Sequence, residues 1–314
     1  MSGPRVTVVI PTMGSRPERL AAALAALAAQ QLPPQDLEVV VGCDPGVQVP
    51  PAPDGLSVRA VEAAAPTSAA AKRNLAWRQA QAPLVAFTDD DCRPAPRWAA
   101  ELLASHARAP DAFIQGCTRP DPAEEDQLWG LAHTQEIVRD SPWHETCNMA
   151  YPRVLLERLG GFDESYGLLG GEDTDLGWRA LELGAPKAYD PSALVWHAVE
   201  QRSFRQAIRE AARTRDQPAV LARFPHLRRE LHLRVFTRRR HGLLLLALGG
   251  AVTRRRLPAA LAAAPYVVHH LSHHRMSPLS VARAMTHLPV RALTDAVAIV
   301  VVARRGLRRG VIAL

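Results

Sequence analysis

The sequence predicts an α/β fold with a mixed, mainly parallel sheet flanked by helices, followed by a basic helical appendage. Short β-branched runs alternate with helical patterns in the first part of the chain, which is typical of a parallel sheet. The charge then changes sign: residues 1–200 contain 16 Lys and Arg against 27 Asp and Glu, whereas residues 201–314 contain 22 arginines and 4 acidic residues. We therefore expect one domain over residues 1–200 and an arginine-rich helical region over residues 201–314.

The first elements form a strand, a helix and a second strand. The run at residues 6–10 consists of Val, Thr and Ile and stops at Pro11, which predicts a buried strand. Ser15 with Glu18 has the form of a capping box, and leucines at helical spacing extend the expected helix to about residue 30. The apolar run at residues 37–41 predicts the next strand, and a βαβ unit of this kind requires parallel strands.

The alternation continues beyond this unit. Apolar runs predict strands over residues 58–61, 84–88, 113–116 and 193–197, and helical spacing predicts helices over 68–81, 96–108, 123–139, 152–159 and 173–182.

Composition limits the class of protein. With 47% hydrophobic and 22% charged residues, the chain can bury a sizeable core and is not disordered. The four cysteines have no CxxC spacing, which disfavours a zinc site and suits a reducing compartment. No secretory signal pattern precedes the first strand, and the uncharged run at residues 242–252 is too short to cross a bilayer. We therefore expect a cytoplasmic protein without a membrane span.

Three aspartates, Asp89, Asp90 and Asp91, come directly after the strand expected over residues 84–88. Ligands in α/β sheets bind outside the carboxyl ends of the strands. In an extended segment Asp89 and Asp91 would point to the same side and Asp90 elsewhere. Carboxylates about 5 Å apart repel by about 3 kcal/mol at an effective dielectric of about 20, and oxygen donors suit Mg²⁺ or Mn²⁺. A solvated acidic turn is the alternative.

Further polar residues follow other predicted strands and turns. Glu172 and Asp173 follow a glycine pair at a predicted helix start, where one of the two could act as a general base. The alternative is that Asp173 or Thr174 simply caps the helix. His197 ends a predicted strand and suits either a metal site or a structural role. Asp44 follows another strand and suits a turn, and Arg73 could clamp a phosphate or lie on a solvated helix face.

Several known site motifs are missing from the sequence. There is no GxGxxG after the first strand, no P-loop, no GxSxG elbow and no HExxH. These absences disfavour dinucleotide-dependent enzymes, P-loop NTPases, serine hydrolases of the elbow type and zinc proteases.

Taken in order, the motifs of residues 5–200 resemble those of a family 2 glycosyltransferase with the Rossmann-like GT-A fold. The matching segments are VVIPT at 8–12, VVVGCD at 39–44, AKRN at 71–74, FTDDDC at 87–92, CNMA at 147–150, GGFDE at 160–164, GEDTDL at 171–176 and VWH at 195–197.

The resemblance implies an inverting, metal-dependent transfer from a nucleotide-diphosphate sugar, with a UDP-, dTDP- or GDP-sugar as donor. It places the donor contacts at Pro11, Thr12, Asp44, Arg73, Asp89 and Asp90, and the Mg²⁺ or Mn²⁺ ligands at Asp91, Asp89 and His197. It also implies Asp173 as the catalytic base with Glu172 orienting the acceptor, and acceptor contacts at Trp143, His144 and Asn148.

The arginine clusters of the second part favour a peripheral position on an anionic membrane surface, the inner face of the plasma membrane. That position suits a glycan or a lipid-linked, cell-envelope acceptor. We expect no nucleic-acid partner, because no known nucleic-acid-binding motif is present and aromatic residues are only 5%. Two alternatives stay open, a nucleotidyltransferase of the same fold class and a polyanion-binding protein with a degenerate enzyme domain.

Overall fold

The computed structural model describes residues 3–212, 217–271 and 278–314. The chain forms two compact units, one of residues 1–123 and 134–198 and the other of residues 124–133 and 199–314. The segment 124–133, which the sequence assigns to the first domain, thus belongs to the second unit.

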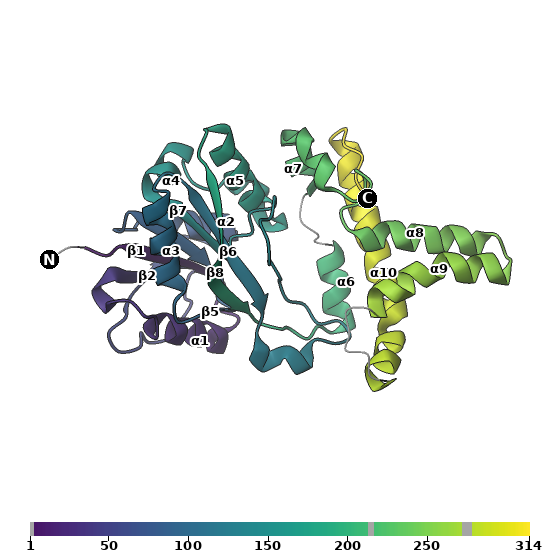
Figure 1. Ribbon diagram of the computed structural model, residues 1–314, viewed down its shortest axis with the longest axis horizontal. Helices are drawn as coiled ribbons and strands as arrows, with labels where there is room; N and C mark the ends of the chain where they lie inside the picture. The colour runs from purple at the N-terminus through teal and green to yellow at the C-terminus, as the bar shows by residue number, and fades with distance from the viewer. Residues whose placement is uncertain (1–2, 213–216, 272–277) are drawn as a thin grey trace. The chain divides into compact units, whose positions relative to one another are not determined.

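The first unit contains a curled eight-stranded sheet with the strand order β3-β2-β1-β4-β7-β6-β8-β5 (Figure 1). The four adjacent strands β3, β2, β1 and β4 are parallel to one another. Strand β7 is antiparallel to both of its neighbours, β4 and β6. The strands are β1 Val6–Thr12, β2 Leu37–Cys43, β3 Ser57–Glu62, β4 Leu84–Thr88, β5 Cys92–Pro94, β6 Phe113–Pro120, β7 Asn148–Pro152 and β8 Lys187–His197. This confirms the predicted mixed, mainly parallel α/β fold.

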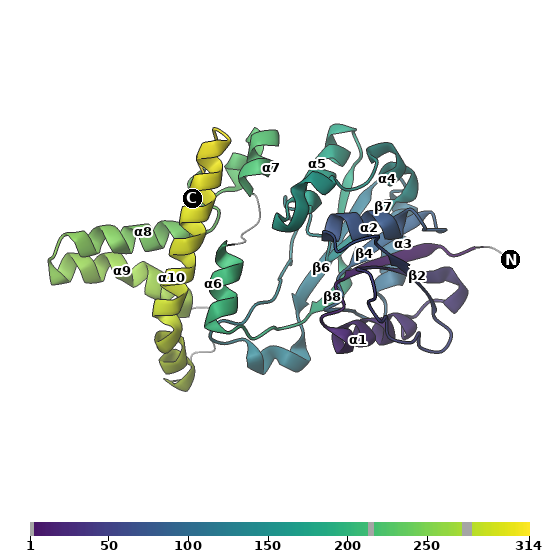
Figure 2. The same ribbon diagram turned by 180° about the vertical axis from the view of Figure 1, so that it is seen from behind.

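Helices cover both faces of this sheet (Figure 2). One apolar core joins the sheet to α1 and α3, and the opposite core joins it to α2, α4 and α5. Every residue of β1, β2 and β4 is buried, as expected for strands that lie between two helical layers. The helices are α1 Pro17–Ala28, α2 Ala69–Trp77, α3 Trp98–Arg108, α4 Arg153–Leu159 and α5 Glu172–Glu182.

Two local expectations were wrong, and two short strands were missed. The helix predicted over residues 123–139 is only a 3₁₀ turn, Pro122–Gln127, after which residue 137 pairs with the sheet instead. The capping box is absent: Arg16 is the N-cap of α1 and no side chain caps it, although Pro17 begins the helix as expected. The short strands β5 and β7 were not predicted.

The second unit is helical. Its helices are α6 Phe204–Ala212, α7 Gln217–Arg223, α8 Arg239–Val252, α9 Arg256–Leu271 and α10 Pro278–Arg308. Helices α8 and α9 lie side by side as a hairpin in both views (Figures 1 and 2). They pack closely because Gly250 has no side chain: a Cβ there would lie 2.3 Å from the Cβ of Ala262.

A buried polar cluster joins α8, α9 and α10. Asp295 accepts hydrogen bonds from Arg240 Nε at 2.6 Å and from the Tyr266 hydroxyl at 3.0 Å. Nε2 of His241 and of His270 lie 3.9 and 3.7 Å from its oxygens. Burial alone would raise the pKa of Asp295, but His270 and Arg240 hold it well below its usual range.

Helix α10 has 31 residues. Within the described residues, the segment Met285–Arg308 has the length and composition to cross a membrane, a candidate that the short uncharged run at residues 242–252 did not indicate. The same test is passed by core helices of soluble proteins, and Asp295 lies within this segment.

Candidate active site

Polar side chains gather at the carboxyl ends of the central parallel strands. Thr12 ends β1, Asp44 follows β2 and Asp89 follows β4. Strands β2, β1 and β4 are adjacent and parallel, so their carboxyl ends lie on one edge of the sheet. Pro11 is buried within β1, opposite Gly42 of β2. The expected donor-binding residues of these three strands therefore share one edge, where ligands of α/β sheets bind.

The three aspartates form a tight turn, not an extended segment. The amide of Cys92 donates to the carbonyl of Asp89 at 3.1 Å, which closes the turn. As a result the expected alternation does not hold: Asp89 faces Arg73, while Asp90 and Asp91 face Arg16 together. The Thr12 hydroxyl also donates to Asp90 at 2.6 Å. Burial raises the pKa of Asp90, and Arg16 and Thr12 oppose that shift.

Arg16 is a site residue that the sequence reasoning missed. Its two terminal nitrogens lie 2.6 Å from Asp90 Oδ1 and 2.6 Å from Asp91 Oδ2. In the sequence, Arg16 lies between Ser15 and Glu18 of the expected capping box and was not assigned to the site. The available signal was an arginine in the loop after the first strand of a strongly acidic domain, at the edge where the aspartates were expected.

Arg73 connects the two acidic clusters. Its guanidinium lies 2.8 Å from Asp89, 3.1 Å from Glu172 and 3.3 Å from Asp173. Burial works against the charged form, but the three carboxylates, Asp173 foremost, outweigh it and raise the pKa of Arg73. The solvated-face alternative for Arg73 is therefore wrong, since this side chain is almost fully buried. Asp89 and Asp173 belong to one site.

Helix α2 is held close to β2 by a glycine. A Cβ at Gly42 would lie 2.3 Å from the carbonyl oxygen of Lys72, so only glycine allows this approach. Lys72 in turn lies 2.7 Å from Asp44, which also accepts from the amide of Thr67 at 3.0 Å. Burial would raise the pKa of Asp44, but the hydrogen bonds from Lys72 and Thr67 lower it.

The second acidic pair lies at the start of α5. Gly171, the N-cap residue, has a φ of 116°, a conformation that side chains other than glycine rarely adopt. Asp173 Oδ1 accepts from the Thr146 hydroxyl at 2.9 Å and Oδ2 from the Thr146 amide at 3.2 Å. Neither Glu172 nor Asp173 is the N-cap of this helix, so the capping alternative does not apply to Asp173.

Asp91 and His197 form a pair that fits a divalent cation. His197 Nε2 lies 3.8 Å from Asp91 Oδ1, and His197 Nδ1 lies 2.9 Å from the carbonyl of Ala198. With its proton on Nδ1, His197 would donate a hydrogen bond to that carbonyl, and the Nε2 lone pair would face Asp91. This arrangement is common among metal-binding histidines. Asp91, Cys92 and His197 place ligand atoms within 4.8 Å of one another. Burial raises the pKa of the Cys92 thiol well above its usual range, so Cys92 is a poor ligand for a hard cation.

The structure corrects the acceptor assignment for His144 and Asn148. Asn148 is fully buried and bonds Trp98, the Cys117 carbonyl and the Ala193 carbonyl. His144 is buried against Gly177 of α5, and burial lowers its pKa to about 3. Both side chains therefore fix the core beneath the site and do not face an acceptor. Trp143 is half-buried, and its carbonyl accepts from Thr174 at 2.8 Å.

A family model described as glycosyltransferase like family 2 matches residues 4–216 of this chain. The chain belongs to this family. Curated relatives in the family include two validoxylamine A glucosyltransferases, from Streptomyces hygroscopicus subsp. limoneus and subsp. jinggangensis. The first is 32% identical over 58% of this chain and 49% of its own length. The second is 31% identical over 58% of this chain and 53% of its own length.

A pre-mycofactocin glycosyltransferase of Mycobacterium tuberculosis is 30% identical over 41% of this chain and 29% of its own length. The chain thus spans about half the length of the two Streptomyces relatives and less of the mycobacterial one.

Solved glycosyltransferase structures share the fold. The mannosyltransferase PcManGT from Pyrobaculum calidifontis, in complex with GDP-Man and Mn²⁺, matches 98% of this chain and 88% of its own, with a TM-score of 0.54 and 19% identity. S. aureus TarS 1–349, in complex with UDP-GlcNAc, matches 98% of this chain and 92% of its own, with a TM-score of 0.52 and 16% identity. These neighbours confirm the GT-A fold that the sequence motifs imply.

Proposed function

We propose that this protein is an inverting, metal-dependent glycosyltransferase that moves a sugar from a nucleotide-diphosphate donor to a hydroxyl group of an acceptor. One observation carries the proposal. At a single sheet edge the described residues bring five carboxylates, Asp89, Asp90, Asp91, Glu172 and Asp173, against two guanidinium groups. This excess of negative charge favours a further cation, and family membership supplies the class of reaction.

The donor end of the site is the edge formed by β1, β2 and β4. Thr12 and Asp44 would contact the nucleoside, with Asp44 held in place by Lys72. Arg73 and Arg16 are the cations closest to the acidic turn and would oppose the charge that develops on the departing diphosphate. The structural neighbours bind GDP-Man and UDP-GlcNAc, and the Streptomyces relatives are named for glucose transfer. UDP-glucose, GDP-mannose and UDP-GlcNAc are therefore the first donors to test.

Mg²⁺ or Mn²⁺ would be held by Asp91 with His197. Asp89 was expected as a third ligand, but its carboxylate is engaged by Arg73 at 2.8 Å. When bound, the ion would neutralise charge on the diphosphate leaving group.

Asp173 would take the proton from the acceptor hydroxyl. Thr146 holds both of its oxygens, which fixes the direction of the carboxylate. The acceptor oxygen would attack from the face opposite the diphosphate, so a single displacement inverts the anomeric carbon without a covalent intermediate. Glu172 would orient the acceptor, and the half-buried Trp143 would stack on a sugar ring.

For the acceptor we propose a glycan or a lipid-linked molecule, and for the location the cytoplasm, at the inner surface of the membrane. The arginine excess of residues 201–314 supports the membrane surface. The family match disfavours both alternatives, a nucleotidyltransferase and a polyanion-binding protein with a degenerate enzyme domain.

The substitution Asp173→Asn tests the proposed base. It keeps the shape and one oxygen acceptor but removes basicity, and we expect transfer to fall about 10²–10⁴-fold. The measurement is nucleoside diphosphate release from each donor with Mn²⁺, using bacterial membranes, validoxylamine A and simple glycans as acceptors. Donor binding, measured by calorimetry, should stay within a few-fold of wild type.

Glu182→Gln is the matched control, because it is an exposed acid at the other end of the same helix α5. It should leave transfer unchanged. Undiminished turnover in Asp173→Asn would reject this residue as the base, and an absence of binding to every donor would reject the proposed function itself.

A further inference from the structure

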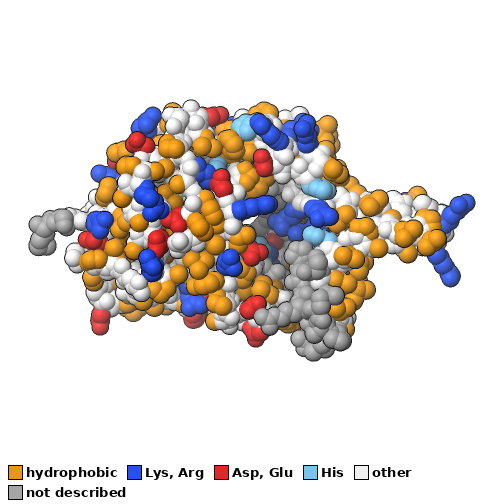
Figure 3. Space-filling model, viewed as in Figure 1, with side chains coloured by type: hydrophobic (Ala, Val, Ile, Leu, Met, Phe, Trp, Pro, Cys, Tyr) orange, Lys and Arg blue, Asp and Glu red, His pale blue; other side chains and the backbone are white. Residues whose placement is uncertain are grey.

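The α8–α9 hairpin exposes an unusual amount of apolar surface. Leu246 and Val252 of α8 are 52% and 79% exposed, and Leu257 and Leu261 of α9 are 70% and 66% exposed. The space-filling view shows hydrophobic side chains over the length of the hairpin and Lys or Arg side chains at its end (Figure 3). Contiguous apolar surface of this kind marks a contact surface for a partner.

The charge around this surface has one sign. Residues 231–314 contain 14 arginines and one acidic residue, Asp295, which is buried against Arg240. Arginines also mark both ends of α8, at positions 238–240 and 254–256. Exposed leucines beside exposed arginines, without exposed carboxylates in the described part of this region, fit a partner that is both apolar and anionic.

We infer that the α8–α9 hairpin docks on an anionic lipid bilayer, with its leucines in the interface and its arginines on lipid phosphates. This inference deepens the membrane-surface location proposed above and names the element responsible. It does not depend on sugar transfer. A second copy of the chain is disfavoured as the occupant, because the same face would bring arginine clusters against one another. A nucleic acid would engage the arginines but leave the leucines in water.

The hairpin lies along the surface and does not cross it. Helices of 14 and 16 residues are about 21 and 24 Å long, shorter than the roughly 30 Å hydrocarbon core. Helix α10 is long enough to cross, but its Asp295 is tied to Arg240 of α8 and Tyr266 of α9. Crossing by α10 would carry this ionic cluster into the hydrocarbon, at a large energetic cost.

Vesicle flotation of the full chain, in EDTA and without any sugar donor, tests this inference. We expect binding to vesicles of phosphatidylglycerol with phosphatidylcholine, and at least tenfold weaker binding to phosphatidylcholine alone. Arg255→Glu with Arg256→Glu should weaken binding to the anionic vesicles at least tenfold, because each basic group near the surface contributes about fivefold. Leu246→Ser with Leu261→Ser should weaken it by a similar factor, since both side chains lose their contact with the acyl chains.

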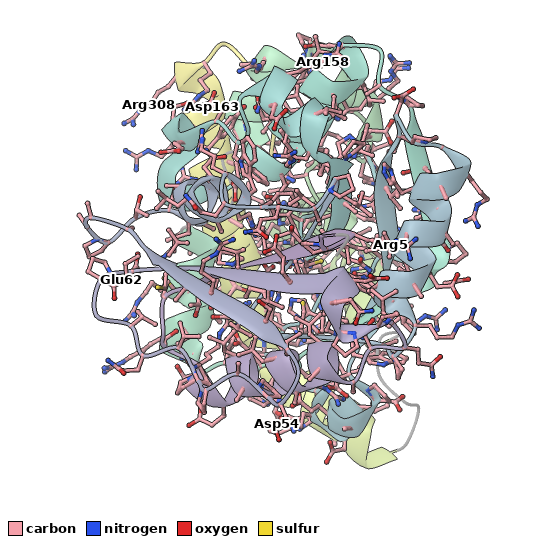
Figure 4. All side chains as sticks on the ribbon, turned by 90° about the vertical axis from the view of Figure 1, so that its left-hand side faces the viewer. Arg5, Asp54, Glu62, Arg158, Asp163 and Arg308 are labelled. Atoms are coloured by element: carbon pink, nitrogen blue, oxygen red, sulfur yellow. The ribbon has the colours of Figure 1, made fainter. Side chains whose placement is uncertain are left out.

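Two substitutions in the first unit serve as matched controls. Arg158→Glu makes the same kind of charge change on an exposed residue at the end of α4, where the side chain lies at the surface (Figure 4). Val154→Ser removes a side chain that is 62% exposed. Neither should change vesicle binding.

Three outcomes would overturn the inference. The first is no binding to anionic vesicles by the wild-type chain. The second is binding that the arginine variant weakens and the leucine variant does not, which would indicate general attraction to polyanions. The third is a dimer in analytical ultracentrifugation without lipid that the leucine variant abolishes, which would make this face an interface between copies. Because no donor is present, each outcome is independent of whether the protein transfers sugar.

Discussion

In the first unit five carboxylates face the two guanidinium groups of Arg16 and Arg73, whereas in the second unit Asp295 alone lies among Arg240, His241 and His270. The pairing chemistry is the same in both places. The ratio of acidic to basic side chains differs between the two clusters. It follows the sequence, since residues 1–200 carry 11 more acidic than basic residues and residues 201–314 carry 18 more basic than acidic ones.

This difference predicts what each unit binds. Where carboxylates exceed guanidinium groups, the remaining negative charge favours a metal ion. Where arginines exceed carboxylates, the remaining positive charge favours an anionic surface. The arginines within each cluster hold acidic groups in place, so each cluster also contributes to folding stability. The stability of each unit can be measured independently of what the unit binds.

The largest expected effect follows from removing Arg73. Arg73→Met leaves the buried Glu172 and Asp173 and the partly buried Asp89 without their shared cation, and we expect the first unit to lose about 3–5 kcal/mol of unfolding free energy. Urea unfolding followed by tryptophan fluorescence measures this, because five of the six tryptophans belong to the first unit. Arg158→Met, an exposed arginine of the same unit, is the control and should change stability by less than about 0.5 kcal/mol. A loss below 1 kcal/mol for Arg73→Met would mean that the carboxylates are protonated or solvated without it.

The second unit is expected to weaken in mild acid because of His241. Burial lowers the pKa of His241 to about 4, whereas the pKa in the unfolded chain is about 6.5. The Leu314 carbonyl and Asp295 act to raise this pKa, and Arg240 and Arg238 act to lower it further. The unfolded state therefore binds more protons than the folded state below pH 6.5, and stability falls as the pH falls from 6.5 to 4. Between pH 7 and pH 5 we expect a loss of about 2 kcal/mol.

Hydrogen exchange of peptides from α8 and α10, corrected for intrinsic rates, measures this loss. His241→Asn keeps a donor near Nδ1, which lies 3.3 Å from the Leu314 carbonyl and 3.1 Å from the Thr237 hydroxyl, but does not titrate. In this variant the pH dependence should be mostly absent, whereas replacing the exposed His226 by Asn should preserve it. An unchanged slope in His241→Asn would assign the acid sensitivity to another group.

Much of the fold and part of the site were predictable from sequence. The strands β2 and β4 were found because their apolar runs are short and bounded by turn residues, and the carboxyl ends of parallel strands must meet. Asp44 and Asp89 could therefore be placed at one edge of the sheet. The order of the family motifs along the chain indicated Asp173 and His197 as further residues of the same site.

The rest depended on contacts that local sequence does not encode. Lys72 in a helical pattern suggests an exposed residue, yet Asp44, distant in sequence, pairs with it in the interior. The pairing of Arg16 with Asp91 spans 75 residues. Asn148 and His144 appear near family motifs, but only the packing of α3 and α5 reveals that they are core residues. The sequence suggested an extended segment for the three aspartates, but the hydrogen bond from the Cys92 amide to the Asp89 carbonyl closes a turn. The side chains of Asp89 and Asp91 therefore do not point to the same side.

The smallest expected effect concerns Arg16, which competes with any metal ion for Asp91. Its side chain is about one-third exposed, so the ion pair is screened and removing it costs little stability. Arg16→Ala should lower the dissociation constant for Mn²⁺ up to about fivefold, because Asp91 is no longer held by a guanidinium at 2.6 Å. The electron paramagnetic resonance signal of free Mn²⁺ during titration measures this without any sugar donor. Arg5→Ala, which removes an exposed arginine paired with Asp36 (Figure 4), is the control and should have no effect. Weaker Mn²⁺ binding in Arg16→Ala would reverse the interpretation: Arg16 would then hold Asp91 in the position that the ion requires.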